Sequence, residues 1–300
     1  MNILITGGTG LIGRALCKQW LAQGHRLWVW SRSPEQVAER CGQAVTGVGR
    51  LQEIDHVPLD AVVNLAGAPI ADRPWTRKRK ELLWASRVGL TEQLLAWLAT
   101  REHRPEVLLS GSAVGFYGDA GERELHEDSP RGASDFAAQL CAGWEDTAQR
   151  ASGLGMRVVL LRTGLVLARD DGFLKRLLLP FKFGLGGPLG NGRQWMPWIH
   201  IADQIALIDF LLQHQQASGP YNACAPRPVR NGEFARALGL ELHRPAILPV
   251  PAFVLRAALG ELSGLLLGGQ HGLPTRLQEA GFSFRFTHLD AALADLLGPH

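Results

Sequence analysis

The sequence has few of the residues that build disulfides or metal sites. Its four cysteines, Cys17, Cys41, Cys141 and Cys224, form no C-x-x-C pair, and its ten histidines show no H-x-x-x-H spacing. We therefore expect free thiols, a reducing cytoplasmic environment and no bound metal.

Long apolar runs and strong net charge are also missing. The most apolar C-terminal stretch, residues 251–267, is interrupted by Arg256 and Glu261, and no basic segment precedes the first apolar run. These features predict neither a membrane-spanning helix nor a signal peptide. The net charge is only +3, and the basic cluster at residues 77–80 is short. A charge this small argues against a nucleic-acid partner, although it is compatible with a local anion-binding site.

The first half of the chain alternates short apolar runs with longer segments of helical periodicity. The apolar runs, which have the length of buried strands, are residues 2–6, 26–30, 60–65, 106–110 and 157–161. The helical patterns between them are residues 11–23, 79–100 and 136–152. This alternation predicts an α/β fold of the Rossmann type, in which helices cover a doubly wound parallel sheet.

The character of the sequence changes after Gly164. A glycine-rich stretch at residues 184–192 is followed by helices that alternate with proline-rich loops. We therefore expect a dinucleotide-binding core over residues 1–168. Residues 169–300 should form a smaller substrate-side and C-terminal α/β lobe that is interleaved with the core.

The turn after the first strand carries the clearest chemical motif, Thr-Gly-Gly-Thr-Gly-Leu-Ile-Gly at residues 6–13. Gly7, Gly10 and Gly13 would permit a sharp turn, close approach of a pyrophosphate and tight packing of the helix on the strand. Leu11 and Ile12 open the helix, whose free N–H groups would face the phosphates. The motif predicts a dinucleotide site.

The end of the second strand predicts which dinucleotide binds. An NAD site usually has an acidic residue here to hold the ribose 2′-hydroxyl, but this strand ends in Ser31 and Arg32. Ser31 can donate a hydrogen bond to a 2′-phosphate, and the Arg32 guanidinium can grip that phosphate or stack on the adenine. We therefore expect NADP(H).

Further motifs resemble the extended short-chain dehydrogenase/reductases, a group that includes the sugar-nucleotide epimerases. Residues 64–67 (Asn-Leu-Ala-Gly) resemble the group's N-x-A-G element. Residues 110–112 (Ser-Gly-Ser) and 117–119 (Tyr-Gly-Asp) resemble its active-site strand and the loop that follows.

Across its whole length the chain is similar to a narrower branch, the atypical "epimerase family" proteins of the YfcH-like type. The shared segments are residues 64–67, Trp75, residues 86–87, 144–145, 162–167, 184–194 and 198–200, Asp203, and residues 221–222.

The resemblance implies several cofactor contacts. Leu65 and Ala66, with Gly67 in the same element, should touch the cofactor through backbone atoms, and Leu165 should lie near the nicotinamide. Arg87 should reach the cofactor from the helix after the fourth strand, although its type and position are equally compatible with a surface ion pair.

The Tyr-x-x-x-Lys pair of these reductases is missing. In that pair the lysine and the nicotinamide lower the tyrosine pKa, so that the phenol can pass a proton. Neither Tyr117 nor Tyr221 has a lysine four residues later, and the helix expected to carry the pair has Phe136 and Leu140. Neither of these side chains can exchange a proton.

Three other residues are candidates for catalysis. Ser112 matches the active-site serine and could polarise a carbonyl, or it could simply bond the strand backbone. Tyr117 could replace the missing acid, although no lysine is expected beside it. Glu145 could carry a proton or lie in solvent.

The glycine-rich stretch and the residues after it would form the wall of a substrate cleft. The candidate substrate contacts in this segment are Arg193, Gln194, Trp198 and His200. Arg193 and Gln194 offer polar contacts, and Trp198 offers a flat apolar face. The alternative is a structural loop with core tryptophans and a satisfied buried histidine at His200.

These observations favour an NADP(H)-dependent oxidoreductase or epimerase-like enzyme on an unidentified small molecule, with nucleotide sugars among the candidates. The missing pair favours an alternative, a non-catalytic NADP(H)-binding or redox-sensing protein. A sugar-nucleotide epimerase with the usual machinery would need an acid that the sequence does not supply. Both a monomer and a homodimer are compatible with the sequence.

Overall fold

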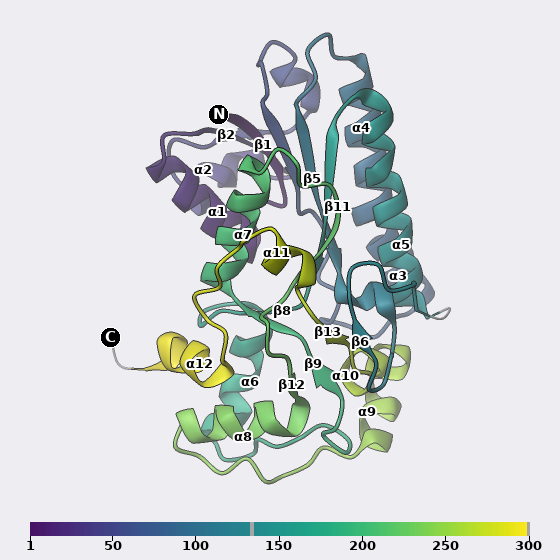
Figure 1. The fold of residues 1–300 in the computed structure, drawn as a ribbon, viewed down its shortest axis with the longest axis vertical. Coiled ribbons are helices and arrows are strands. Elements are labelled where there is room, and N and C mark those ends of the chain that lie inside the picture. Colours follow the sequence, from purple (N-terminus) through teal and green to yellow (C-terminus); the bar gives the residue numbers. More distant parts are fainter. Residues whose placement is uncertain (133–134, 299–300) are drawn as a thin grey trace.

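A seven-stranded parallel sheet forms the centre of the molecule (Figure 1). The computed structural model describes residues 1–132 and 135–298. The strand order is β11-β7-β5-β4-β1-β2-β3. The strands are β1 (Asn2–Thr6), β2 (Arg26–Trp30), β3 (Thr46–Val48), β4 (Ala61–Asn64), β5 (Val107–Ala113), β7 (Arg157–Thr163) and β11 (Gly219–Ala223). The predicted Rossmann-type α/β fold is confirmed.

Helices cover both faces of the sheet, because successive residues of a strand point to opposite sides. Ile3 of β1 belongs to one core together with Trp20 of α1 (Leu11–Ala22) and Leu207 of α7 (Ile201–Gln213). Leu4, the next residue of β1, belongs to a second core with Leu94 of α4 (Leu90–Thr100). Helix α5 (Phe136–Gln149) contributes Ala148 to the second core. The short helix α2 (Val37–Cys41) contributes Val37 and Cys41 to the first core.

A smaller lobe lies at the carboxyl end of the strands (Figure 1). Its core joins Phe181, Phe234 and Leu293 from three helices. The helices beyond the main sheet are α6 (Gly172–Lys182), α8 (Asn231–Glu241), α9 (Ala252–Leu259), α10 (Gly264–Leu267), α11 (Thr275–Glu279) and α12 (Leu289–Leu297). Three strand pairs complete this region: β8 (Leu165–Leu167) with β10 (Trp198–His200), β9 (Trp195–Met196) with β12 (Val229–Arg230), and β6 (Glu124–Leu125) with β13 (His271–Gly272).

The chain returns from the lobe to the central sheet. Strand β11 pairs with β7 in parallel, from Gly219 opposite Val159 to Ala223 opposite Thr163. The central sheet therefore includes one strand, β11, that lies after residue 168 in the sequence. The domain boundary expected at residue 168 stays a prediction. None of the helices in the described ranges is long and apolar enough to cross a membrane.

The helix expected over residues 79–100 is interrupted. The structure has α3 (Arg77–Trp84), one π-helical turn at Ala85–Gly89, and then α4. Within that turn the Ser86 hydroxyl accepts a hydrogen bond from the N–H of Ala68, and Arg87 donates to the Ala68 carbonyl at 3.1 Å. The π-helical turn thus contacts the loop after β4 through Ser86 and Arg87. Such turns are frequent at functional sites.

The C-terminal segment is tied to α7 by one buried carboxylate. Asp203 accepts hydrogen bonds from the N–H groups of Arg285 at 2.8 Å and Phe286 at 2.9 Å. Burial raises the pKa of Asp203, while these two N–H groups act in the opposite direction. The bonds fix the start of the chain segment that leads into α12.

We expect Asp203→Ala to lower the free energy of unfolding by about 3 kcal/mol, because two backbone N–H groups lose a charged acceptor. Urea unfolding followed by circular dichroism measures the change. Asp290→Ala, at an exposed position in the first turn of α12, is the control and should cost less than about 1 kcal/mol. Equal losses in the two variants would contradict this role.

Candidate functional site

The turn between β1 and α1 is closed by two very close backbone contacts. Gly7 has a φ of +70°, and a Cβ atom there would lie 2.6 Å from the carbonyl oxygen of Leu65. A Cβ atom on Gly13 would lie 2.4 Å from the carbonyl oxygen of Gly7. Glycine is therefore required at both positions.

The first turn of α1 has no side-chain cap. Gly10 occupies the N-cap position, so no side chain accepts a hydrogen bond from the N–H groups of Leu11, Ile12 or Gly13. A helix N-terminus in this state is suited to an anionic group, because its N–H groups and its dipole both favour negative charge.

The end of β2 lies beside this turn, since Thr6 of β1 pairs with Trp30. Ser31 accepts a hydrogen bond from the N–H of Ser33 at 3.1 Å. Arg32 is exposed and makes no hydrogen bond or ion pair with any described residue. Its guanidinium is thus available for an anion next to the phosphate-binding turn.

The segment after β4 is held against the same turn. The Thr6 hydroxyl donates to Asn64 at 2.6 Å and accepts from the N–H of Ala66 at 3.1 Å. These bonds place the backbone of Leu65 and Ala66 beside Gly7. The three residues of the resemblance, Leu65, Ala66 and Gly67, therefore border the predicted dinucleotide site.

Arg87 lies against Gly67, where an added Cβ atom would be 2.8 Å from the guanidinium carbon. The guanidinium also lies 5.4 Å from the ring of Trp144. Burial lowers the pKa of Arg87, and no carboxylate among the described residues forms an ion pair with it. The surface ion pair considered from the sequence is not found among the described residues, and the guanidinium instead donates to the Leu83 and Ala68 carbonyls and the Ser86 hydroxyl.

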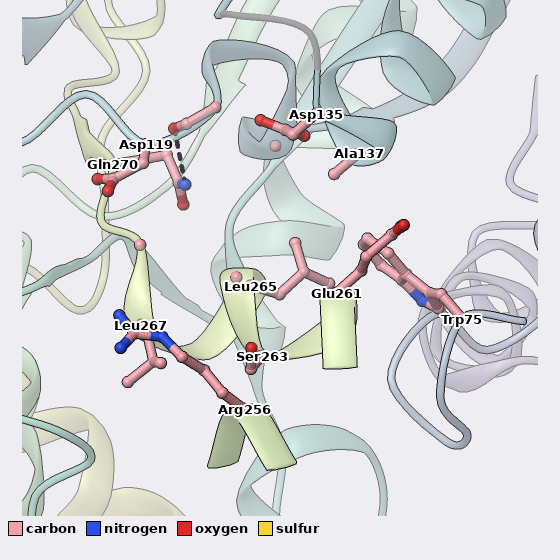
Figure 2. Close-up of a pocket in the computed structure, with 14 residues that line it drawn as sticks. Trp75, Asp119, Asp135, Ala137, Arg256, Glu261, Ser263, Leu265, Leu267 and Gln270 are labelled. Carbon is pink, nitrogen blue, oxygen red and sulfur yellow. Dashed lines mark hydrogen bonds between the residues drawn. The ribbon is translucent and has the colours of Figure 1, made fainter. Parts of the chain in front are cut away.

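A cleft opens between the sheet and the lobe. One cavity, of about 370 Å³, is called the inner chamber because it borders Ala113 and Thr163 at the ends of β5 and β7; Cys141 and Leu165 of the core and lobe residues such as Phe173 also border it. Its outer chamber, of about 290 Å³, is shown in Figure 2. Five residues border both chambers: Gly115, Ala137, Leu265, Gly268 and Gln270. Leu165 borders the inner chamber, and its expected place near the nicotinamide stays a prediction.

Helix α5 faces the cleft with Ala137 and Cys141, not with the expected Phe136 and Leu140. Phe136 instead packs against Trp75, with ring centroids 5.1 Å apart, and Leu140 is buried in the interior. The cleft-facing residues are thus one position further along the chain than the two considered for the missing pair, because sequence spacing does not fix which side of a helix faces a cavity. Burial raises the pKa of the Cys141 thiol to about 12, so this thiol is protonated at neutral pH.

Ser112 and Tyr117 belong to a buried network and do not border either chamber. The Ser112 hydroxyl donates to Glu145 at 2.6 Å, and Arg162 donates to both oxygens of Glu145 at 2.8 and 2.9 Å. Arg162 also donates to the Tyr117 hydroxyl, which donates to Asn222 at 2.7 Å. Burial raises the pKa of Tyr117 to about 12.

Both hydroxyl groups are engaged inside the protein and neither residue borders a chamber, and the catalytic roles considered for Ser112 and Tyr117 stay predictions. Sequence reasoning missed Arg162, which organises the network. A signal was available, since Arg162 is a charged residue in an otherwise apolar strand, and buried charges are normally paired.

The expected substrate contacts divide into two groups. Gln194 borders the inner chamber, whereas Arg193 is exposed and borders neither chamber. Trp198 is fully buried and donates its indole N–H to the carbonyl of Arg227 at 2.9 Å. His200 is also buried, and its Nδ1 accepts a hydrogen bond from the N–H of Ala202. Trp198 and His200 are thus buried and border neither chamber, as the alternative considered from the sequence describes, and their role in substrate binding stays a prediction.

The chain matches two family descriptions. Residues 3–224 match the NAD dependent epimerase/dehydratase family, and residues 250–296 match a domain of unknown function, DUF1731. Epimerase family protein YfhF of Bacillus subtilis is 36% identical over 301 residues, which cover 99% of this chain and 98% of the relative. Epimerase family protein SDR39U1 of Mus musculus is 38% identical over 305 residues, covering 99% and 100%.

Solved structures show the same relationship. Human epimerase family protein SDR39U1 (isoform 2), crystallised with NADPH, has a TM-score of 0.90 and 35% identity, with both chains fully covered. UDP-glucose 4-epimerase of Thermus thermophilus, solved with NAD, has a TM-score of 0.79 at 17% identity, again with both chains fully covered. At that identity the likeness concerns the fold alone.

The buried His200 makes stability depend on pH. Desolvation lowers its pKa from 6.5 to about 4, although Asp295 opposes the shift. Between these pH values the unfolded chain binds a proton at His200 that the folded chain does not bind. The contribution of the neutral imidazole to the free energy of unfolding is therefore complete above pH 6.5 and is lost as the pH falls towards 4.

We expect the wild-type free energy of unfolding to fall by about 3 kcal/mol more than that of His200→Asn between about pH 7 and pH 4. The asparagine oxygen can still accept from the N–H of Ala202, which keeps the helix cap. Urea unfolding at several pH values tests this difference. Parallel pH profiles of the two proteins would show that His200 is not the group responsible.

Proposed function

The chain belongs to the NAD dependent epimerase/dehydratase family, and on that basis we propose that it is an NADP(H)-dependent oxidoreductase acting on a small molecule held in the cleft. The observation that carries the proposal is the continuity of the site. An uncapped helix N-terminus, a free arginine and an apolar chamber follow one another along the carboxyl edge of the sheet.

The residues present fit a dinucleotide. The glycine turn leaves the N–H groups of α1 open to a pyrophosphate, and the backbone of Leu65 and Ala66, which lies against Gly7, would border the adenine side of a bound dinucleotide. Arg32 supports the choice of NADP(H), because its free guanidinium can bind a 2′-phosphate. The NADPH in the human SDR39U1 crystal structure, at 35% identity, supports the same choice.

We assign to Arg87 the positive charge that the missing lysine would provide. Cys141 borders the inner chamber, and Arg87 lies against Gly67 in the segment after β4, with its guanidinium 5.4 Å from the ring of Trp144 on the same helix as Cys141. Because Arg87 lacks a carboxylate partner, it can attract the polar parts of a cofactor at this end of the site.

When bound, the reduced cofactor supplies a hydride to an electrophilic carbon of the substrate. The chain's part is to orient the substrate and to limit water in the inner chamber. Among the described residues that border this chamber there is no carboxylate, imidazole, phenol or amine, and burial raises the pKa of the Cys141 thiol to about 12. In this proposal the substrate oxygen takes its proton from a single water molecule and not from a side chain of the chamber wall.

The lack of a proton-donating side chain beside the chamber, among the described residues, also favours the second candidate, a non-catalytic NADP(H)-binding or redox-sensing protein. Ala137 and Cys141 occupy the cleft-facing positions of α5, and Ser112 and Tyr117 are used elsewhere. In that case the protein would bind NADPH and release it unchanged.

The two candidates differ in turnover. We expect slow NADPH oxidation with at least one member of a panel of aldehydes and ketones, measured by loss of nicotinamide absorbance. Because no side chain of suitable pKa borders the chamber among the described residues, kcat should show no break between about pH 6 and pH 8. NADPH binding without turnover on the whole panel would favour the second candidate, and a bell-shaped profile would reveal an unrecognised acid or base.

Cofactor preference depends on Arg32. Calorimetry should show that Arg32→Gln weakens NADPH binding by about tenfold or more, with less than about a twofold effect on NADH, since one charge-assisted contact to phosphate is lost. Arg40→Gln is the matched control, because Arg40 is also exposed and lies on the neighbouring α2. If Arg32→Gln weakened NADPH and NADH binding equally, or if Arg40→Gln weakened NADPH binding as much as Arg32→Gln does, Arg32 would not be the source of a preference for NADP(H).

A further inference from the structure

The inner chamber offers a ligand mainly apolar contacts. Apart from the residues at its cofactor end, its walls include Val114, Phe173, Met196, Leu265 and Leu266. These side chains come from the core and from three separate parts of the lobe, so they enclose the space from several sides. Such a lining favours an apolar ligand, because each buried apolar group contributes favourably when water is displaced.

The polar side chains of this chamber each make at least one hydrogen bond within the protein, and Arg176 keeps further N–H donors free. Gln194 donates to the carbonyls of Leu189 and Leu266, and Gln270 donates to the carbonyl of Gly118. The other engaged polar side chains are Thr163, bonded to Leu161; Arg176, bonded to Ala71; and Asn231, bonded to Leu189 and Met196. A polar ligand would have to compete for these groups or lose its hydrogen bonds to water.

The outer chamber has three carboxylates, and all three have partners. Asp119 accepts from the N–H of Gly269 at 3.1 Å, Asp135 caps α5 through the N–H of Ala138, and Glu261 pairs with Lys80. Figure 2 shows Asp119 and Asp135 on one side of this chamber and Arg256 near Leu267 on another. Three carboxylates around one opening disfavour a ligand with several negative charges.

Arg256 is the exception among these charged groups. It extends from α9, borders the outer chamber, and forms no hydrogen bond or ion pair with a described residue. A free guanidinium at the mouth of an apolar chamber is suited to a single carboxylate or similar anion.

We propose that the cleft binds an amphipathic substrate whose apolar body fills the inner chamber and whose single anionic end meets Arg256 in the outer chamber. This substrate class rests on the proposed function, because the apolar body would lie beside the nicotinamide end of the same site. It also disfavours nucleotide sugars, whose diphosphate and hydroxyl groups would meet engaged polar side chains and three carboxylates.

The test is calorimetry on the NADPH-saturated protein with three kinds of probe. These are straight-chain carboxylates from hexanoate to dodecanoate, the alcohol of the same length as the best carboxylate, and UDP-glucose. We expect one carboxylate to bind best, the matching alcohol to bind about fivefold more weakly because it lacks the charge, and UDP-glucose to bind more weakly than either.

Two pairs of variants locate the binding. Arg256→Gln should reduce carboxylate affinity to that of the alcohol and leave alcohol affinity unchanged, whereas Arg236→Gln, at an exposed position on α8 with no described partner, should change neither. Leu265→Glu should weaken both probes at least about tenfold by placing a charge in the chamber. Leu179→Glu, at a 65% exposed position on α6, should have no effect.

The outcomes separate this inference from the proposed function. If NADPH does not bind in the first titration, the proposed function fails. If NADPH binds but no carboxylate of the series does, or if UDP-glucose binds more tightly than the best carboxylate, the substrate class is wrong. Carboxylate binding that Leu265→Glu does not weaken would also overturn it, because the probe would then lie outside the cleft.

Discussion

The close approach of the β1–α1 turn to the end of β4 is the constraint on which the site depends. Gly7 passes so near Leu65, and Gly13 so near Gly7, that no side chain fits at either position. This packing brings the uncapped N-terminus of α1 to the carboxyl edge of the sheet, where its N–H groups and dipole can meet a pyrophosphate. The contact between Gly7 and Leu65 also fixes the position of the following segment, in which Gly67 lies against the guanidinium of Arg87.

Two kinds of charged group lie near the carboxyl edge of the sheet: a buried ion pair, and arginines without a carboxylate partner among the described residues. Arg162 and Glu145 are buried together and hold Ser112 and Tyr117, so the charges satisfy each other within the fold. Removing one partner of such a pair is costly, since it leaves an uncompensated buried charge. Arg32 and Arg87 lack a carboxylate partner among the described residues, and a bound dinucleotide would supply the negative charge that they lack. What distinguishes Arg32 and Arg87 from other arginines without a carboxylate partner is their position beside the glycine turn and the segment after β4.

Much of the fold could be predicted from the sequence, because strand length, helical periodicity and the glycine spacing are local properties. The strand over residues 26–30 and the helix start at Leu11 match the structure. The π-helical turn at Ala85–Gly89 depends on contacts with the loop at Ala68, which periodicity does not reveal. The cleft-facing positions of α5 depend on how that helix is rotated against the sheet. Trp198 and His200 have the residue types of a binding site, but long-range packing buries them.

The absence of an acid or base of suitable pKa beside the cofactor end of the cleft, within the described part of the chain, is the central claim of this account. A crystal structure of the protein with NADPH tests it most directly. We expect the pyrophosphate at the N-terminus of α1, the 2′-phosphate at Arg32, and the nicotinamide between Leu165 and Cys141. No carboxylate, imidazole, phenol or amine should then lie within about 3.5 Å of the nicotinamide C4. A bound nicotinamide with such a group at that distance, or a cofactor seated away from the glycine turn, would contradict the account.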